Sequence, residues 1–102
     1  MKQIEGGDLQ DGEAAFVVLD GSMKPNFLPG CTVIVKTGRK VLDFQIGVIR
    51  AGADYILARV FHESGGQVLT FDNRDFERVR IRTAETKTAI IGPVTGWKKK
   101  GC

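Results

Sequence analysis

The chain has 102 residues, of which 42% are hydrophobic, and this length supports one folded domain with a single core. Its net charge is +3, part of which comes from the lysines at 98–100, so the remaining body gives no general signal for nucleic-acid binding. No segment approaches the roughly 18 apolar residues of a membrane span, and no basic-then-apolar leader opens the chain. We therefore expect a soluble, cytoplasmic protein with no membrane partner.

The two cysteines, Cys31 and Cys102, lie far apart and lack the spacing of a metal-binding pair. Cys31 stands between a turn and an apolar run, which is typical of a small buried thiol. We expect neither a disulfide framework nor a zinc site here. No other metal site and no cofactor is expected.

Short apolar runs bounded by turn residues predict an almost entirely β structure. In chain order, the expected strands are residues 16–19, 32–36, 45–50, 55–61, 67–71, 79–82 and 88–97. A proline at position 93, inside the last run, predicts an edge position or a bulge.

The expected organisation is one domain with two short flanking segments. We expect residues 1–13 to be a loosely held lead-in, residues 14–97 the folded domain, and residues 98–102 a basic tail. The predicted fold is an antiparallel β-sheet that meanders into a partly closed barrel.

Ser22 is the candidate nucleophile. It follows the apolar run 16–19 in the segment Gly21-Ser22-Met23-Lys24-Pro25. A tight turn at a strand end leaves a hydroxyl exposed without crowding, as a nucleophile requires. The hydroxyl also needs a base close enough to take its proton.

Further segments extend the pattern that begins at Ser22. They are residues 22–25, 29–30, 43–48, 55–60, 71–76 and 91–96. In this order and spacing, the chain resembles the C-terminal catalytic domain of the LexA/UmuD family of self-cleaving serine–lysine peptidases, related to phage repressors and signal peptidases. The resemblance covers about Phe16 to Trp97 and implies an all-β, mostly antiparallel, barrel-like LexA/signal-peptidase fold.

The resemblance also implies roles for residues around the serine. Ser22 matches the nucleophile, the N–H groups of Gly21 and Ser22 match the oxyanion hole, and Met23 and Pro25 match the surrounding motif. One departure lies here, because the family usually places glycine two residues before the serine, where this chain has Asp20. A carboxylate facing the site would disfavour a developing oxyanion.

The general base is the larger departure. The family uses a buried lysine, typically followed by an arginine; Arg59 matches the arginine, and the lysine position falls on Ala58. Arg59 cannot replace the lysine because guanidinium stays protonated in proteins. We expect Lys24 to be a solvated surface charge and His62 to lie at a hairpin end, too far along the strand to act as the base. Without a base the chain is expected to be close to inert.

Other departures indicate a divergent member. Cys31 stands where an aspartate is common, and Phe44 where a glycine is usual. No small-residue dipeptide of the family's cleavage type precedes Ser22, and the dipeptide at 51–52 reads as a hairpin tip. A DNA-binding helix-turn-helix is absent, so the sequence is either a C-terminal domain taken from a longer repressor or a stand-alone relative.

Two functions remain open. The first is a silent interaction module that forms a homodimer through residues 89–94, although this run could equally only fill the core; DNA would be bound only through an absent N-terminal domain. The second is a self-processing peptidase whose base lysine has been replaced at Ala58. The family further implies a RecA-type co-protease or an antirepressor as partner. Arginines at 74, 78, 80 and 82 interleave with acidic residues and predict a solvated, salt-bridged face.

Overall fold

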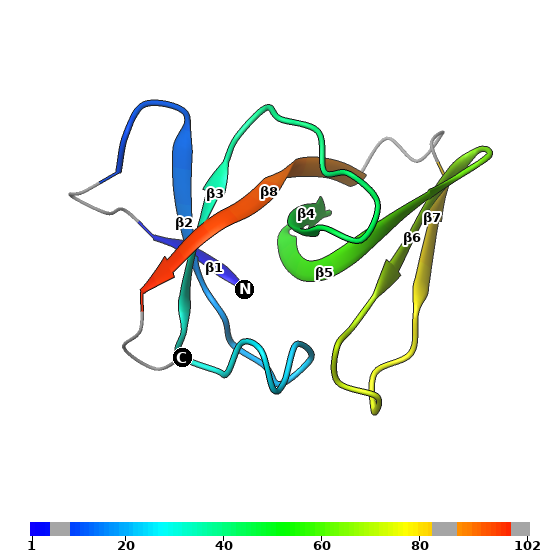
Figure 1. Ribbon diagram of the computed structural model, residues 1–102, viewed down its shortest axis with the longest axis horizontal. Coiled ribbons are helices and arrows are strands. Elements are labelled where there is room, and N and C mark those ends of the chain that lie inside the picture. The colour runs from blue at the N-terminus through cyan, green and yellow to red at the C-terminus, as the bar shows by residue number, and fades with distance from the viewer. Residues whose placement is uncertain (5–8, 83–87, 99–102) are drawn as a thin grey trace.

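The computed structural model describes residues 1–4, 9–82 and 88–98, and in these ranges the chain is all-β. Eight antiparallel strands in this part of the chain form one curled sheet, a half-barrel (Figure 1). The strands are β1 (Lys2–Ile4), β2 (Glu13–Val17), β3 (Thr32–Lys36), β4 (Ile46–Ala51), β5 (Asp54–Glu63), β6 (Gly66–Thr70), β7 (Val79–Arg82) and β8 (Thr88–Lys98). Their order across the sheet is β1-β2-β3-β8-β4-β5-β6-β7.

The all-β prediction is confirmed, and each predicted strand has a counterpart. The first begins earlier than predicted, at Glu13, and ends at Val17. β1 was not predicted, because its Lys-Gln-Ile sequence forms no apolar run of its own; it is held by pairing with β2, Lys2 opposite Val17. Residues 5–8 of the predicted lead-in and residues 99–102 of the predicted tail lie outside the described residues.

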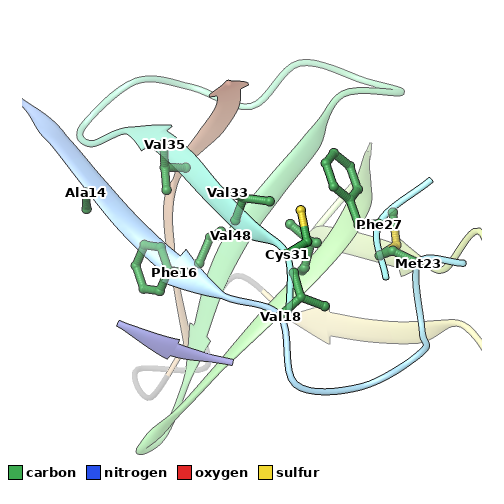
Figure 2. Packing of buried hydrophobic residues seen from close by; sticks show 10 residues of the cluster. Ala14, Phe16, Val18, Met23, Phe27, Cys31, Val33, Val35 and Val48 are labelled. Carbon is green, nitrogen blue, oxygen red and sulfur yellow. The ribbon is translucent and has the colours of Figure 1, made fainter. Parts of the chain in front are cut away.

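Alternation of buried and exposed side chains along the strands builds two core clusters. β3 shows it most plainly, with Val33 and Val35 fully buried between half-exposed neighbours. The first cluster contains Ala14, Phe16, Val18, Met23, Phe27, Cys31, Val33, Val35, Val48 and Leu57 (Figure 2). The second contains Val41, Ile49, Ala58, Val60, Leu69 and Ile81. Each cluster therefore draws on strands far apart in the sequence.

β8 joins the two halves of the sheet, and Figure 1 shows it crossing the centre of the molecule. Its C-terminal part pairs with β3 and its N-terminal part pairs with β4. The register shifts on both sides, between Val48 and Ile49 of β4 and between Ile34 and Val35 of β3. The bulge expected from Pro93 is therefore confirmed. The alternative edge position is wrong, because β8 has a neighbouring strand on each side.

The sheet curls until β1 approaches β5. The Tyr55 hydroxyl donates to Gln3 Oε1 at 3.3 Å, and the Met1 ammonium donates to the Tyr55 carbonyl at 2.8 Å. This contact closes the half-barrel on one side. In the described ranges, no helix is long and apolar enough to cross a membrane.

Cys31 corrects one expectation. It is fully buried, as predicted, and belongs to the first core cluster. It is disulfide-bonded rather than a thiol. The chain's other cysteine, Cys102, lies outside the described residues.

Gly92 allows a test of how closely β8 passes the backbone at the end of β3. A Cβ at this position would lie 1.8 Å from the Lys36 carbonyl oxygen, which belongs to rigid backbone. We expect Gly92→Ala to lower the free energy of unfolding by roughly 3 kcal/mol or more, measured by urea denaturation. Gly96→Ala on the same strand is the matched control, because a Cβ there meets nothing within 4 Å. Equal stability of the two variants would contradict the close crossing.

Candidate active site

A run of tight turns after β2 carries Ser22. The Lys24 amide donates to the Gly21 carbonyl at 3.2 Å, and the Phe27 amide donates to the Met23 carbonyl at 3.1 Å. Met23 is fully buried and Phe27 is nearly so, and both pack in the first core cluster beside Val18 (Figure 2). The apolar anchors thus fix the backbone of the turn, as the predicted strand-end placement of Ser22 requires.

The Ser22 side chain is held close to the core yet not sealed in it. Ser22 is 5% exposed and is the one buried polar residue in the described part of the chain. Its hydroxyl forms no hydrogen bond within the described residues, and no fully buried polar side-chain atom there lacks a partner. The hydroxyl therefore keeps contact with solvent.

That contact runs through a small cavity of about 170 Å³. The cavity is mostly apolar and is lined by Met1, Asp20, Ser22, Tyr55, Ile56, Leu57, Phe71 and Phe76. It brings the serine turn together with β5 and with the segment that follows β6. A small substrate group could approach the hydroxyl here.

One of the two donors of the predicted oxyanion hole is already hydrogen-bonded. The Ser22 amide, one of its two expected donors, donates to Asp20 Oδ1 at 3.0 Å. A substrate oxygen would have to displace this carboxylate and would develop negative charge beside it. The departure at Asp20 noted in the sequence is therefore a hydrogen bond to one of the predicted oxyanion donors.

Ala58, in the position predicted for the base, lies in a filled core. It is 0% exposed and packs in the second cluster with Val41. Its cross-strand partner is Gly47, and a Cβ on Gly47 would meet a Val41 methyl at 2.6 Å. Ala58 shares its face of β5 with Ile56, which lines the Ser22 cavity two residues away, roughly 6.6 Å along the strand. Ala58 is therefore enclosed among apolar side chains, and a Val41 methyl fills the space over its cross-strand partner Gly47.

No other nitrogen takes the place of the base within the described residues. His62 Nε2 lies 2.6 Å from the Val41 carbonyl, and the His62 amide donates to Asp43, so His62 ties the end of β5 to the preceding loop. Lys24 is exposed, and its side-chain carbons fold over Gly21. The Met1 ammonium is at the cavity but donates to the Tyr55 carbonyl.

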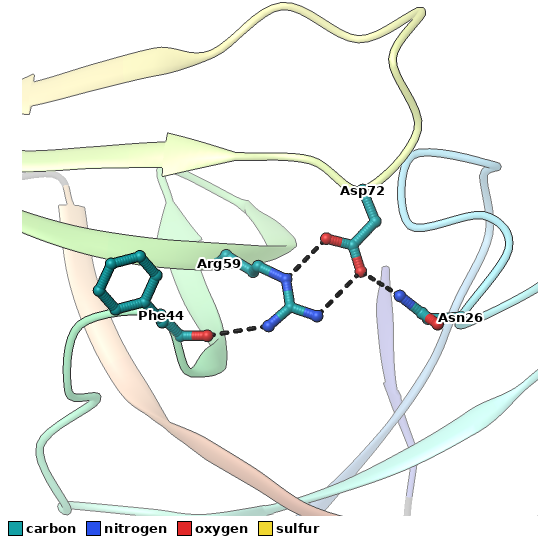
Figure 3. Close-up of polar contacts among 4 residues, drawn as sticks. All are labelled: Asn26, Phe44, Arg59 and Asp72. Atoms are coloured by element: carbon teal, nitrogen blue, oxygen red, sulfur yellow. Dashed lines mark hydrogen bonds and ion pairs between the residues drawn. The ribbon is translucent and has the colours of Figure 1, made fainter.

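Arg59 has a structural role that its match to the family did not specify. Its Nε and Nη2 donate to both oxygens of Asp72, at 2.7 and 3.3 Å, and its Nη1 donates to the Phe44 carbonyl at 2.9 Å (Figure 3). Asn26 Nδ2 completes the network by donating to Asp72 Oδ2 at 2.5 Å. This network joins β5, the segment after β6, the serine turn and the loop before β4.

Asn73 was missed as a site residue. Its Nδ2 donates to the Gly21 carbonyl at 2.8 Å, and its amide donates to the Ser22 carbonyl at 2.9 Å. Asn73 therefore holds both residues of the predicted oxyanion hole from a segment far along the chain. The available signal was the matching segment 71–76, whose turn residues have the side chains for such bonds.

The backbone conformation at Phe44 bears on a further difference from the family, which usually has glycine at this position. Its φ is 72°, in the left-handed region that glycine adopts without strain, which agrees with the glycine usual at this position in the resembling family. The ring is 68% exposed and packs edge-on against Phe61 with centroids 4.7 Å apart. Among the described residues, no three metal-ligating side chains gather into a possible metal site.

A comparison with protein families decides the classification. The sequence model described as Peptidase S24-like matches residues 3–95. The chain belongs to the Peptidase S24-like family. This confirms the resemblance to LexA/UmuD-type peptidases that the sequence segments indicated. A search of curated proteins finds no match to the chain.

In this S24-like chain the serine turn and its cavity are formed, whereas the base position holds a methyl group and one oxyanion donor is bound to a carboxylate. The roles of Ser22, Ala58 and Gly21 stay predictions.

The hydrogen bonds of Arg59 should contribute to the free energy of unfolding of the S24-like domain. We expect Arg59→Lys to lower the free energy of unfolding by about 1–3 kcal/mol, because an ammonium cannot bind both Asp72 oxygens and the Phe44 carbonyl together. Urea denaturation measures this. The matched control is Arg80→Lys, since the ion pair of Arg80 within the described residues is an exposed one with Glu63 at 3.6 Å, and its loss should be nearly neutral. Similar losses for both variants would contradict the proposed role.

Proposed function

We propose that this S24-like domain is catalytically silent and acts as a self-associating module in transcriptional regulation. The observation that carries the proposal is the hydrogen bond from the Ser22 amide to Asp20, together with an apolar residue at the predicted base position. These two features oppose different steps of the same reaction. The first opposes the developing oxyanion, and the second leaves the serine proton without an acceptor.

Loss of the base alone would abolish most of the activity. Removing one member of a nucleophile–base unit typically lowers the rate by a factor of about 10⁴ to 10⁶. The hydroxyl of Ser22 has no hydrogen-bond acceptor within the described residues, so no side chain there is poised to take its proton. The retained turn is then explained by packing, because Met23 anchors it in the core.

Self-association is supported by an exposed aromatic face. Phe44 and Trp97 are 68% and 57% exposed, and both line a hollow of about 220 Å³. The hollow is completed by Phe27, Gln45, Ile46, Arg59 and Val94. A face that carries both projecting rings and a hollow can meet a copy of itself across a two-fold axis. Residues 89–94, the contact predicted for the homodimer from the sequence, belong to β8, which lies between β3 and β4 in the sheet, so we place the association on this aromatic face.

The regulatory context rests on the family. A dimerising domain of this kind would bring two separate N-terminal DNA-binding domains to paired half-sites. In that arrangement, DNA contacts come from the N-terminal domain, and a RecA-type co-protease or an antirepressor is the expected regulatory partner in the cytoplasm.

The second candidate is an active peptidase observed with its lysine replaced at Ala58. The observation that favours it is the intact setting of Ser22, with a solvent-accessible hydroxyl and a cavity in front of it. The two candidates predict different peptidase activities for the variant Ala58→Lys.

Restoring the lysine separates the candidates. We expect Ala58→Lys to stay inactive against a peptide containing Ala-Gly at alkaline pH, because Asp20 still occupies the Ser22 amide. Overpacking against Val41 should also lower the stability by about 1–3 kcal/mol. Cleavage is measured by mass spectrometry, with Ala58→Met as the uncharged control of similar length. Ser22-dependent cleavage by Ala58→Lys alone would overturn the silent assignment.

The aromatic face gives the test of self-association. We expect Phe44→Gly to shift the protein toward monomer without loss of stability, because it removes an exposed ring and relieves the left-handed backbone. Analytical ultracentrifugation over a dilution series measures the mass. Leu42→Ser is the control, since Leu42 is 61% exposed but does not line the hollow. A monomeric parent protein at high concentration would contradict the self-association.

A further inference from the structure

The cavity in front of Ser22 extends from the surface toward the core. Asp20 and Phe76, which line it, are exposed, whereas Ser22 and Leu57 are 5% and 3% exposed. Its volume is about 170 Å³. A protein cavity of about 150 Å³ can hold one benzene molecule, whereas drug-sized ligands occupy pockets of about 300 Å³ or more. The volume therefore matches a ligand with a single small ring.

Three aromatic side chains line this cavity. Tyr55 belongs to β5, and Phe71 and Phe76 belong to the segment that follows β6. The Phe71 and Phe76 rings have centroids 6.0 Å apart and an interplanar angle of 56°, and Tyr55 packs against Phe16 of the core at 4.8 Å. An aromatic ligand gains favourable ring contacts here in addition to the burial of its apolar surface. The lining therefore favours an aromatic ring over an aliphatic ligand of the same size.

The polar groups of the cavity lie together. The Ser22 amide donates to Asp20 Oδ1 at 3.0 Å, which places the Ser22 hydroxyl and the carboxylate of Asp20 side by side. Within the described residues, neither this hydroxyl nor Asp20 Oδ2 takes part in a hydrogen bond. A carboxylate accepts hydrogen bonds only, and a hydrogen bond to a charged group is stronger than one between neutral groups. The polar groups therefore match a ligand that carries a hydrogen-bond donor.

The charges at the cavity restrict the ligand further. The carboxylate of Asp20 disfavours an anionic ligand, because like charges repel. Met1 also lines the cavity, and its ammonium, which donates to the Tyr55 carbonyl at 2.8 Å, disfavours a cationic ligand. A neutral donor meets neither repulsion. A hydroxyl attached directly to an aromatic ring satisfies the volume, the lining and the charges together.

We propose that the Ser22 cavity binds a small phenol. Its ring lies among Tyr55, Phe71 and Phe76, its hydroxyl donates to Asp20 Oδ2, and the phenol oxygen accepts from the Ser22 hydroxyl. This inference goes beyond the proposed function, because it requires neither self-association nor any reaction of Ser22. The bound ring would cover the Ser22 hydroxyl and exclude water from it.

The test titrates phenol into the whole chain and follows the backbone amides by NMR. We expect saturable shift changes at Ser22, Tyr55 and Phe71, with a dissociation constant on the order of 1 mM or tighter. Phe76→Leu should weaken binding roughly threefold or more, because it removes one ring of the lining. The matched control is Phe61→Leu, the same replacement at a ring that does not line this cavity, and it should bind as the parent does. A dispersed spectrum shows that each variant is folded.

Three further one-ring ligands separate the contributions of the polar groups. Toluene has nearly the size of phenol but no donor, benzoate is anionic, and benzylammonium is cationic. We expect each to bind roughly fivefold or more weakly than phenol. Asp20→Asn should reduce the preference for phenol over toluene, because the charged acceptor becomes a neutral one.

Five outcomes would overturn the proposal. The absence of saturable shifts with phenol would show that the cavity holds water only. Equal binding of toluene would make it an unselective apolar cavity. Tighter binding of benzoate would assign the selectivity to the Met1 ammonium, and tighter binding of benzylammonium would assign the cavity to organic cations. Equal weakening by Phe61→Leu would place phenol elsewhere on the protein.

Discussion

The ion pair between Arg59 and Asp72 is the contact on which the geometry of the site depends. It lies between a strand of the sheet and the segment after β6, and the same carboxylate accepts from Asn26 in the serine turn. Charge-assisted bonds to both oxygens of one carboxylate fix orientation as well as distance. The turn that carries Ser22 is therefore positioned in part by side chains from later segments of the chain.

The backbone of the turn that carries Ser22 is held by contacts that do not involve the predicted base position. The apolar anchors and the bonds from Asn73 hold the turn irrespective of what stands at the base position. Asp20 then satisfies the Ser22 amide that catalysis would leave free for a substrate. At Ala58 the core is closed by Val41, which stands over Gly47. The contacts that hold the Ser22 turn are thus different from those that Asp20 and Ala58 make.

Much of the fold was predictable because strands of this chain are short apolar runs between turns. The same signal fails for β1, which has one apolar residue and exists through pairing with β2. It also cannot distinguish an internal strand from an edge when proline is present, and β8 accommodates Pro93 inside the sheet with bulges.

Within the site, the sequence placed Ser22 on a strand-end turn with an exposed hydroxyl, whereas the structure leaves the residue only 5% exposed. The bonds of Asn26 with Asp72 and of Asn73 with Gly21 could not be assigned, because they join segments about fifty residues apart and depend on the curl of the sheet. Residue types such as Asp and Asn indicate a turn, but the sequence does not show which residues their side chains bind.

The position of β8 in the chain order has a consequence for how the protein is made. The two halves of the sheet are joined only when β8 pairs with both β3 and β4, and in register Thr32 meets Lys98. During synthesis, the facing edges of β3 and β4 must wait until nearly the whole domain has been translated. Such long-range pairing slows folding and leaves apolar strands exposed meanwhile.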